Sequence, residues 1–321
     1  GTFARVYRGS LCGASGPPGS PSTVAVKCIR SRHLYNPARK PKWLEREAQM
    51  AQIKKHPNIV QILDVSIDQE PCVLVMEYCA GGSIYDLLFN RSAAAGAKAP
   101  EAAPQKPALH VINWCQRMKV AMDVAAGMAH LHSMGILHRD LKTANVMLVQ
   151  QLTGPAMEPH AKIGDFGLAR FLEEGLANDK NKYLTSDVGS SIYMAPEVFT
   201  CMAEQGKAPY TNKMDVYSYS MMLYELLTDC LPYQGREELK SRNPQGVGHL
   251  VGREHVRPDA EQIPDDAPGV LQDVMRRAWV FKPVERPAFR EIIQELDPAY
   301  MSMVYRSRLS HLSRSNPFAP G

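Results

Sequence analysis

The sequence has few of the features that mark membrane-spanning, disulfide-bonded or nucleic-acid-binding proteins. Its 321 residues contain no apolar run of about 18 residues, so we expect no membrane span. Lys and Arg (37) exceed Asp and Glu (33) by only 4, too small a surplus to predict a nucleic-acid partner. The 7 cysteines form no Cys-x-x-Cys pair, which argues against a disulfide framework and a zinc site. Reduced thiols fit an intracellular protein, and we expect a cytoplasmic location.

What remains is the composition of an ordinary globular protein, with proline gathered in three places. Apolar residues make up 45% and charged residues 22%, and the length favours about two domains or lobes. Residues 93–108 combine eight Ala with three Pro, and residues 10–22 and 150–160 are similarly biased. Since proline breaks helices and long surface loops cost little entropy, we expect disordered inserts there. The chain begins at Gly1 without Met, so we expect a fragment; its oligomeric state cannot be predicted.

Hydrophobic periodicity predicts strands early in the chain and helices later. Residues 23–30 are rich in β-branched side chains and residues 72–78 are nearly all apolar, which is typical of strands. Residues 43–55 and 111–129 carry apolar side chains at steps of three and four, which is typical of helices. The order predicts a small sheet-rich lobe followed by a larger helical lobe.

A lysine inside the strand 23–30 is the first candidate functional residue. Lys27 needs a partner because an unpaired charge away from water is costly. The helix predicted at 43–55 offers Glu47 on its apolar face. Two interpretations of a Lys27–Glu47 pair stay open. The pair serves only to join the strand to the helix, or it holds Lys27 in position to bind phosphate oxygens.

Two loops supply further polar groups with a fixed spacing. His138–Asn145 reads His-Arg-Asp-Leu-Lys-Thr-Ala-Asn, which presents a carboxylate, Asp140, and an amide, Asn145. Asp165-Phe166-Gly167 follows a short strand-like segment and adds a carboxylate suited to a metal ion. With Val-Ala-Val-Lys preceding both, the three motifs stand in the order of the protein-kinase signature.

On these motifs the chain resembles eukaryotic protein kinase catalytic domains, most closely the tyrosine-kinase-like group of Ser/Thr kinases. The resemblance implies an α+β, two-lobed fold with a small β-rich N-lobe and a larger α-helical C-lobe. It implies truncation at the N-terminus, since the family's first strand and first glycine would precede Gly1. The implied boundaries are a kinase domain at 1–297 (N-lobe 1–76, hinge 77–82, C-lobe 83–297, low-complexity insert 90–108) and a flexible tail at 298–321.

The resemblance also implies a role for each motif residue. Lys27, locked by Glu47, would hold the α- and β-phosphates of ATP. Asp140 would accept the proton of the substrate hydroxyl, and Lys142 would neutralise the γ-phosphate. Asn145 and Asp165 would bind Mg²⁺ or, in its place, Mn²⁺. The other implied ATP contacts are Gly1 in the Gly-rich loop, Val6, Ala25 and Met147 around adenine, Met76 at the back pocket, and the backbone of Glu77 and Cys79. The implied structural residues are Glu197, Asp215 and Arg286.

Substrate preference and regulation are predicted from two further segments. Lys142 and the residues before Ala195-Pro196-Glu197 resemble Ser/Thr kinases, so we expect a protein substrate with Ser or Thr hydroxyls. Dual-specificity or tyrosine kinase activity, or a pseudokinase scaffold, stay open as alternatives. In the segment between Asp-Phe-Gly and Ala-Pro-Glu, the candidate phosphorylation sites are Thr185, Ser186 and Ser190, with Thr185 or Ser186 favoured as the switch.

Overall fold

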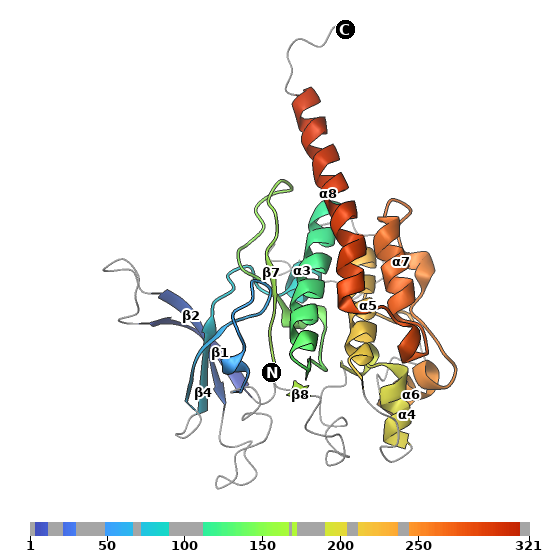
Figure 1. The fold of residues 1–321 in the computed structure, drawn as a ribbon, viewed down its shortest axis with the longest axis horizontal. Coiled ribbons are helices and arrows are strands. Elements are labelled where there is room, and N and C mark those ends of the chain that lie inside the picture. The colour runs from blue at the N-terminus through green and yellow to red at the C-terminus, as the bar shows by residue number, and fades with distance from the viewer. Residues whose placement is uncertain are drawn as a thin grey trace.

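The structure is a computed structural model with a β-sheet lobe beside a larger helical lobe (Figure 1). It describes residues 4–11, 22–29, 49–66, 72–89, 112–166, 169–171, 190–203, 211–236 and 244–314. The two-lobed α+β architecture expected from the sequence is therefore confirmed. None of the helices in the described part of the chain has both the length and the hydropathy needed to cross a bilayer.

The small lobe is built on one antiparallel sheet of four strands in the order β1-β2-β4-β3. These strands are β1 (Ala4–Leu11), β2 (Ser22–Ile29), β3 (Ile62–Ser66) and β4 (Cys72–Glu77). Val6 pairs with Lys27 and Ala25 pairs with Met76 across neighbouring strands. Since side chains alternate faces along a strand, these four side chains share one face of the sheet.

The large lobe is formed mainly by helices that pack around α3 and α5. The described helices are α2 (Ile84–Phe89), α3 (Trp114–Ser133), α4 (Pro196–Ala203), α5 (Lys213–Thr228), α6 (Pro244–Gly252), α7 (Gly269–Ala278) and α8 (Phe289–Arg314). Helix α3 begins later than predicted because Asn113 caps it: its side chain accepts a hydrogen bond from Gln116 N. Four short strands form two antiparallel pairs. One pair is β5 (Ile136–Leu137) with β8 (Arg170–Phe171), and the other is β6 (Val146–Leu148) with β7 (Ala161–Ile163).

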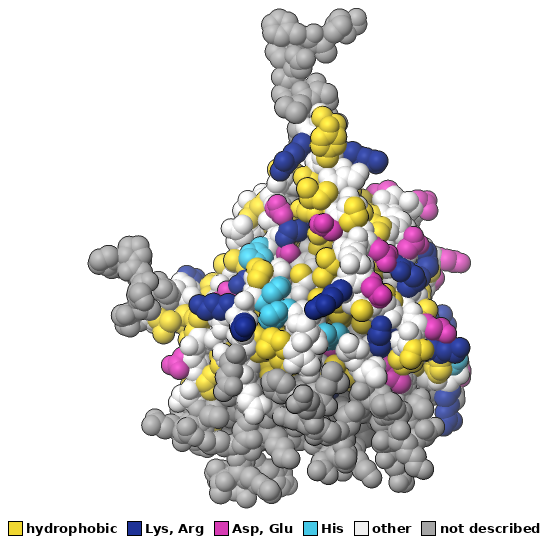
Figure 2. Space-filling view, viewed as in Figure 1, with side chains coloured by type: hydrophobic (Ala, Val, Ile, Leu, Met, Phe, Trp, Pro, Cys, Tyr) yellow, Lys and Arg dark blue, Asp and Glu magenta, His cyan; other side chains and the backbone are white. Residues whose placement is uncertain are grey.

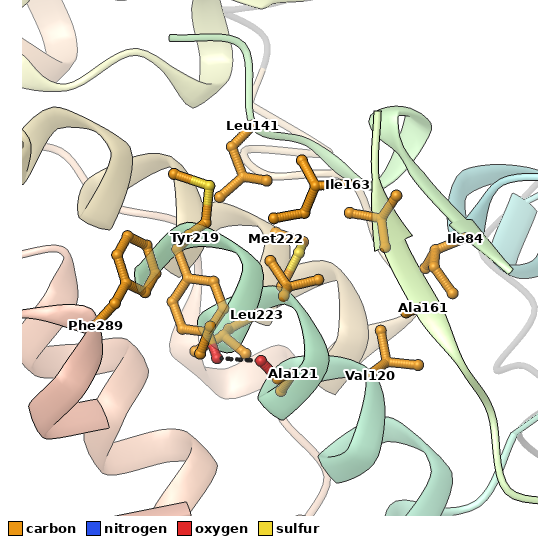
Figure 3. Close-up of a cluster of buried hydrophobic side chains, with 14 of the residues drawn as sticks. Ile84, Val120, Ala121, Leu141, Ala161, Ile163, Tyr219, Met222, Leu223 and Phe289 are labelled. Carbon is orange, nitrogen blue, oxygen red and sulfur yellow. Dashed lines mark hydrogen bonds between the residues drawn. The ribbon is translucent and has the colours of Figure 1, made fainter. Parts of the chain in front are cut away.

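A buried hydrophobic cluster lies directly beneath the loop between β5 and β6 (Figure 3). Leu141, the residue after Asp140, is fully buried and points into this cluster with Ile163 of β7 and Met222 of α5. The hydroxyl of Tyr219 donates a hydrogen bond to the Ala121 carbonyl at 2.9 Å, joining α5 to α3. Burial of Leu141 therefore anchors the loop that bears Asp140.

The helix predicted at 43–55 differs from the structure at its end. Most of it lies outside the described residues, but its last part is a 3-10 turn, Met50–Gln52, and Ile53 is extended. His56 and Pro57 follow, and a proline disfavours helical backbone before it. The prediction of a continuous helix to Lys55 was therefore wrong.

Two segments expected to be disordered are ordered. Residues 150–160 form a loop between β6 and β7, where Gln116 Nε2 donates to the carbonyls of Gly154 and Met157 at 3.0 and 2.8 Å. Residues 298–314 continue α8 instead of forming a flexible tail, because Tyr300 is buried in the core and Val304 packs against it. The insert 90–108 and residues 315–321 lie outside the described residues.

Candidate active site

The loop between β5 and β6 brings three of the expected polar residues together. Lys142 Nζ lies 2.9 Å from Asp140 Oδ2 and 3.1 Å from Oδ1. Asn145 Nδ2 donates to the Asp140 backbone carbonyl at 2.7 Å and to Oδ2 at 2.9 Å. The Asp140 carboxylate is thus held in one orientation by an ammonium group and an amide on its own loop.

A buried carboxylate on α5 holds the start of this loop in an unusual backbone conformation. Arg139 has a φ of 69°, a region that side chains other than glycine rarely adopt. Asp215, fully buried, accepts hydrogen bonds from His138 N and Arg139 N at 3.0 and 2.8 Å and contacts His132 Nε2 at 2.9 Å. Burial raises the pKa of Asp215, but the hydrogen bond and charge of His132, the charge of His138 and the Arg139 N–H together lower it more, so the pKa lies below its ordinary value.

The two lobes meet at an ion pair between Lys27 and Asp165. Lys27 Nζ lies 3.0 Å from Asp165 Oδ1, and the Asp165 side chain is 52% exposed. Desolvation raises the pKa of Asp165, but the charge and hydrogen bond of Lys27, together with the charges of His138 and Lys142, lower it more, so the pKa of the carboxyl lies below its ordinary value. Asp165 has a φ of 60°, in the left-handed region. The residue before it, Gly164, is held by the fully buried His138 ring, whose Nε2 lies 3.1 Å from the Gly164 carbonyl oxygen.

The donor set around Asp140 and Asp165 fits a hard divalent cation. Because Asn145 uses its Nδ2 group for both bonds to Asp140, its Oδ1 can still bind a cation. The half-exposed Asp165 carboxylate adds charged oxygen. Oxygen ligands of this kind are those that Mg²⁺ prefers. In the described part of the chain, no group of three or more His, Cys, Asp or Glu side chains is arranged to hold a metal ion.

The segment that joins the lobes is fixed by the Glu77 side chain at the end of β4. Lys162 Nζ on β7 donates to both Glu77 carboxylate oxygens at 2.7 and 2.6 Å, and Gln61 N donates to Oε1 at 2.6 Å. Burial, with the Glu77 charge next in effect, raises the pKa of the Cys79 thiol to about 11, so this cysteine stays protonated. Met147 of β6 pairs with Lys162, which puts both side chains on the same face.

An ion pair and a buried carboxylate hold α4 and the turn before it on the large lobe. Glu197 and Arg286 pair through two hydrogen bonds, at 2.7 and 2.8 Å. Glu225, fully buried on α5, accepts hydrogen bonds from Thr143 Oγ1 at 2.5 Å and from the Tyr193 hydroxyl. Sequence reasoning did not identify Glu225, because a glutamate in an otherwise apolar helix carries no motif of its own.

The remaining candidates are placed only in part. Gly1, Glu47, Thr185 and Ser186 lie outside the described residues. Ser190 begins the 3-10 helix Ser190–Tyr193, and only its backbone is described. Val6 is 62% exposed on the sheet face that it shares with Ala25, Lys27 and Met76.

The sequence is similar to known proteins over most of its length. The sequence profile of the family described as protein tyrosine and serine/threonine kinase matches residues 1–296. The chain is 29% identical to serine/threonine-protein kinase STY46 of Arabidopsis thaliana, covering 92% of this chain and 42% of the relative. It is 31% identical to mitogen-activated protein kinase kinase kinase 11 of Rattus norvegicus, covering 92% and 30%. It is also 29% identical to the Raf homolog serine/threonine-protein kinase of Caenorhabditis elegans, covering 96% and 33%. The chain therefore spans less than half the length of these relatives.

Proposed function

The chain belongs to the protein tyrosine and serine/threonine kinase family, and we propose that it transfers the γ-phosphoryl group of ATP to Ser and Thr hydroxyls of protein substrates. The observation that carries the proposal is that two carboxylates, Asp140 and Asp165, are each held by a lysine. The first is oriented by Lys142 and Asn145, and the second faces Lys27 at 3.0 Å. Phosphoryl transfer needs such positioned charges more than it needs covalent chemistry.

In this proposal Asp140 orients the substrate hydroxyl and accepts its proton. Lys142 lies within 3.1 Å of the same carboxylate, where its ammonium group would also neutralise charge on the transferred phosphoryl group. Lys27 binds the α- and β-phosphates, and the expected lock by Glu47 stays a prediction. Together these groups align the reactants and compensate developing negative charge.

Asn145 and Asp165 would hold the divalent cation, for which we propose Mg²⁺, with Mn²⁺ as a substitute. When bound, the cation would offset negative charge on the phosphate oxygens. A titration of activity with each metal chloride, after removal of metal by chelation, tests this assignment. Full activity in the presence of excess chelator would contradict it.

Adenine would lie between the two lobes. Val6 and Ala25 share the sheet face that carries Lys27, and Met147 lies on the face of β6 and β7 that meets Glu77 through Lys162. We expect Glu77 and Cys79 to bond the base through their backbone, and Met76 to restrict access behind it.

Preference for Ser and Thr over Tyr is supported by Lys142 in the catalytic loop and by the names of the relatives. The test incubates the protein with γ-labelled ATP and a generic basic protein, then separates phosphoserine, phosphothreonine and phosphotyrosine after hydrolysis. Label in phosphoserine and phosphothreonine alone supports the proposal. Label in phosphotyrosine favours the dual-specificity or tyrosine alternative, and nucleotide binding without transfer favours the pseudokinase alternative.

Thr185 or Ser186 remains our proposed activating phosphorylation site. Arg139 precedes Asp140, and an arginine there can order a phosphorylated segment through charge-assisted hydrogen bonds. Phosphopeptide mapping of active protein should find one of the two residues modified. Active protein with neither modified would remove this proposal.

We also propose that the domain works in the cytoplasm. The cysteines that the structure describes are free thiols, namely Cys28, Cys72, Cys79, Cys115 and Cys230. Fractionation of cells that express the tagged full-length protein tests this location.

A further inference from the structure

A histidine pair joins the loop before β3 to helix α3. The rings of His56 and His130 stack with their centroids 4.7 Å apart and their planes inclined by 21°. His160 lies next to the same loop, with its Nε2 2.8 Å from the Pro57 carbonyl. Figure 2 shows histidine side chains at the surface over the region where α3 and β7 lie side by side in Figure 1. None of these rings has a part in the proposed phosphoryl transfer.

The loop that carries His56 is hydrogen-bonded to the strand that leads into Asp165. Ile163 N donates to the Asn58 carbonyl at 2.9 Å, and Val60 N donates to the Ile163 carbonyl at 2.8 Å. Asn58 Nδ2 adds a bond to the Ala161 carbonyl at 3.0 Å. Asp165 follows Ile163 by two residues, so the loop and the start of the Asp165 turn are positioned together.

The hydrogen bonding of His56 determines where it can take up a proton. Asn58 N donates to His56 Nδ1 at 3.1 Å, so Nδ1 has its lone pair and the hydrogen of the neutral ring lies on Nε2. A second proton can bind only at Nδ1. That proton would face the Asn58 N–H and break the bond, because two donors cannot pair.

The second ring of the stack, His130, packs against His56 from helix α3. His130 Nε2 is buried and has no hydrogen-bond partner among the described residues. The proton that affects the loop is the one at His56 Nδ1, and the surroundings of His56 oppose its charge.

The charged groups around His56 come from α3, β7 and its own loop. Asp123 on α3 would favour the cation, but it is already bonded to Lys119 Nζ at 2.7 Å and to Ala161 N at 2.9 Å. Lys162 on β7, paired with Glu77, opposes it. Burial, followed by His130, lowers the pKa of His56 below its ordinary value; Asp123 acts in the opposite direction and Lys162 in the same one. Lys54 and Lys55 precede it, exposed to solvent, on the loop.

We propose that His56 is a proton-sensitive latch, which holds the 56–60 loop on β7 when neutral and releases Asn58 when protonated at Nδ1. The latch sets how firmly the strand before Asp165 is held. It acts on the folded chain whatever the chain's activity, and only its consequence for catalysis rests on the proposed function.

The direction of the pH dependence follows from the lowered pKa of His56. The unfolded chain, with an ordinary histidine pKa of about 6.5, takes up the proton at a higher pH than the folded chain does. Stability from the neutral latch is therefore complete above about pH 6.5 and is lost as the pH falls through the folded value.

Hydrogen exchange of the β7 amides tests the latch without any catalytic assay. Protection of peptides that contain Ile163, corrected for intrinsic exchange rates, is measured at about pH 7.0 and 5.5 in the wild type, His56→Asn and His255→Asn. The shorter amide side chain of His56→Asn can accept the Asn58 N–H but cannot titrate. His255 stacks on Phe281 away from this loop and serves as the matched histidine control.

We expect wild type and His255→Asn to lose about threefold to tenfold of their protection at the lower pH, and His56→Asn to lose none beyond error. An equal loss in His56→Asn, or no loss in the wild type, would overturn the latch. If His56→Asn does not fold, His130→Phe keeps an aromatic stack and should retain the pH-dependent loss; its disappearance there would also overturn the assignment to His56. If hydrogen exchange shows the latch but the protein has no kinase activity, this inference stands and only the proposed function is removed.

Discussion

Arg286 and Glu197 lie 89 residues apart in the chain and form two parallel hydrogen bonds, 2.7 and 2.8 Å long. The guanidinium group is fully buried and also donates to the carbonyls of Val280, Lys213 and Phe281. The pair fastens the start of α4 to the turn before α8. Its burial and its two-pronged geometry make it specific for arginine.

Arg286→Ala should lower the free energy of unfolding by about 3–5 kcal/mol, because it leaves the Glu197 carboxylate without its buried partner. Arg286→Lys should recover only part of this loss, since an ammonium group cannot make the same set of bonds. Urea denaturation measures both. Arg277→Ala, which breaks a half-exposed pair with Glu295, is the control and should cost less than about 1 kcal/mol. Equal losses for the two alanine variants would refute the assigned role of burial.

Asp215→Asn should disturb the catalytic loop more than its size suggests. The Asp215 carboxylate accepts the N–H groups of His138 and Arg139, and Arg139 has a strained backbone. We expect about a tenfold or greater fall in kcat, with a smaller change in the KM for ATP, because Asp140 loses its fixed position. Steady-state kinetics check this, and an unchanged kcat would contradict it.

The lowered pKa of Asp215 also predicts how stability depends on pH. An aspartate in the unfolded chain has a pKa of about 3.9, so the folded carboxylate contributes fully above that value. Its contribution is lost as the pH falls further, through the folded pKa. Asp215→Asn should therefore remove part of the acid destabilisation seen in urea denaturation below about pH 4. If the free energy of unfolding falls by the same amount in the wild type and in Asp215→Asn below that pH, the prediction is contradicted.

Glu225 should show the opposite pH dependence. Burial raises the pKa of Glu225 to about 7, although the hydrogen bonds from Thr143 and Tyr193 act against the shift. Since the unfolded chain loses this proton first, at a pKa of about 4.3, the folded chain binds more protons above that value and its stability falls as the pH rises. Glu225→Gln, which has no charge to bury, should gain stability relative to the wild type between about pH 5 and 8. A stability difference that does not change over this range would contradict the prediction.

Gly127→Ala should destabilise the protein even though alanine favours helices. A Cβ at Gly127 of α3 would lie 2.7 Å from the Asn58 carbonyl oxygen, and backbone cannot move aside at low cost. We expect a loss of about 1–3 kcal/mol in urea denaturation. Gly246→Ala on α6, where a Cβ meets nothing within 4 Å, should be neutral or stabilising. If Gly127→Ala and Gly246→Ala change the free energy of unfolding equally, the close approach of the 56–60 loop to α3 is contradicted.

The motif residues could be predicted because phosphoryl transfer restricts both their types and their order. Lys27, Asp140 and Asp165 were selected from the sequence, and the first and last meet at 3.0 Å. The strands 23–30 and 72–78 were predicted to within a residue because β-branched and apolar runs carry the signal locally.

The supporting contacts could not be predicted, because they join segments far apart in the chain. Glu225 is hydrogen-bonded to Tyr193 and Thr143, which lie 32 and 82 residues before it in the chain. The His56–His130 stack likewise joins a loop of the small lobe to a helix of the large lobe. Residues 298–314 read as a polar tail, since the sequence does not show that Tyr300 and Val304 lie against the core. Tertiary packing decides such segments more than local propensity does.

The most direct test of the proposed function is the rate of phosphoryl transfer to a basic protein by the wild type, Asp140→Asn and Asp64→Asn. Asp64 lies exposed on β3, so its variant controls for the loss of a carboxylate elsewhere. We predict that Asp140→Asn lowers kcat by about 100-fold to 10,000-fold while Asp64→Asn keeps the wild-type rate. Transfer by Asp140→Asn at the wild-type rate, or no transfer by the folded, ATP-binding wild type, would contradict the account.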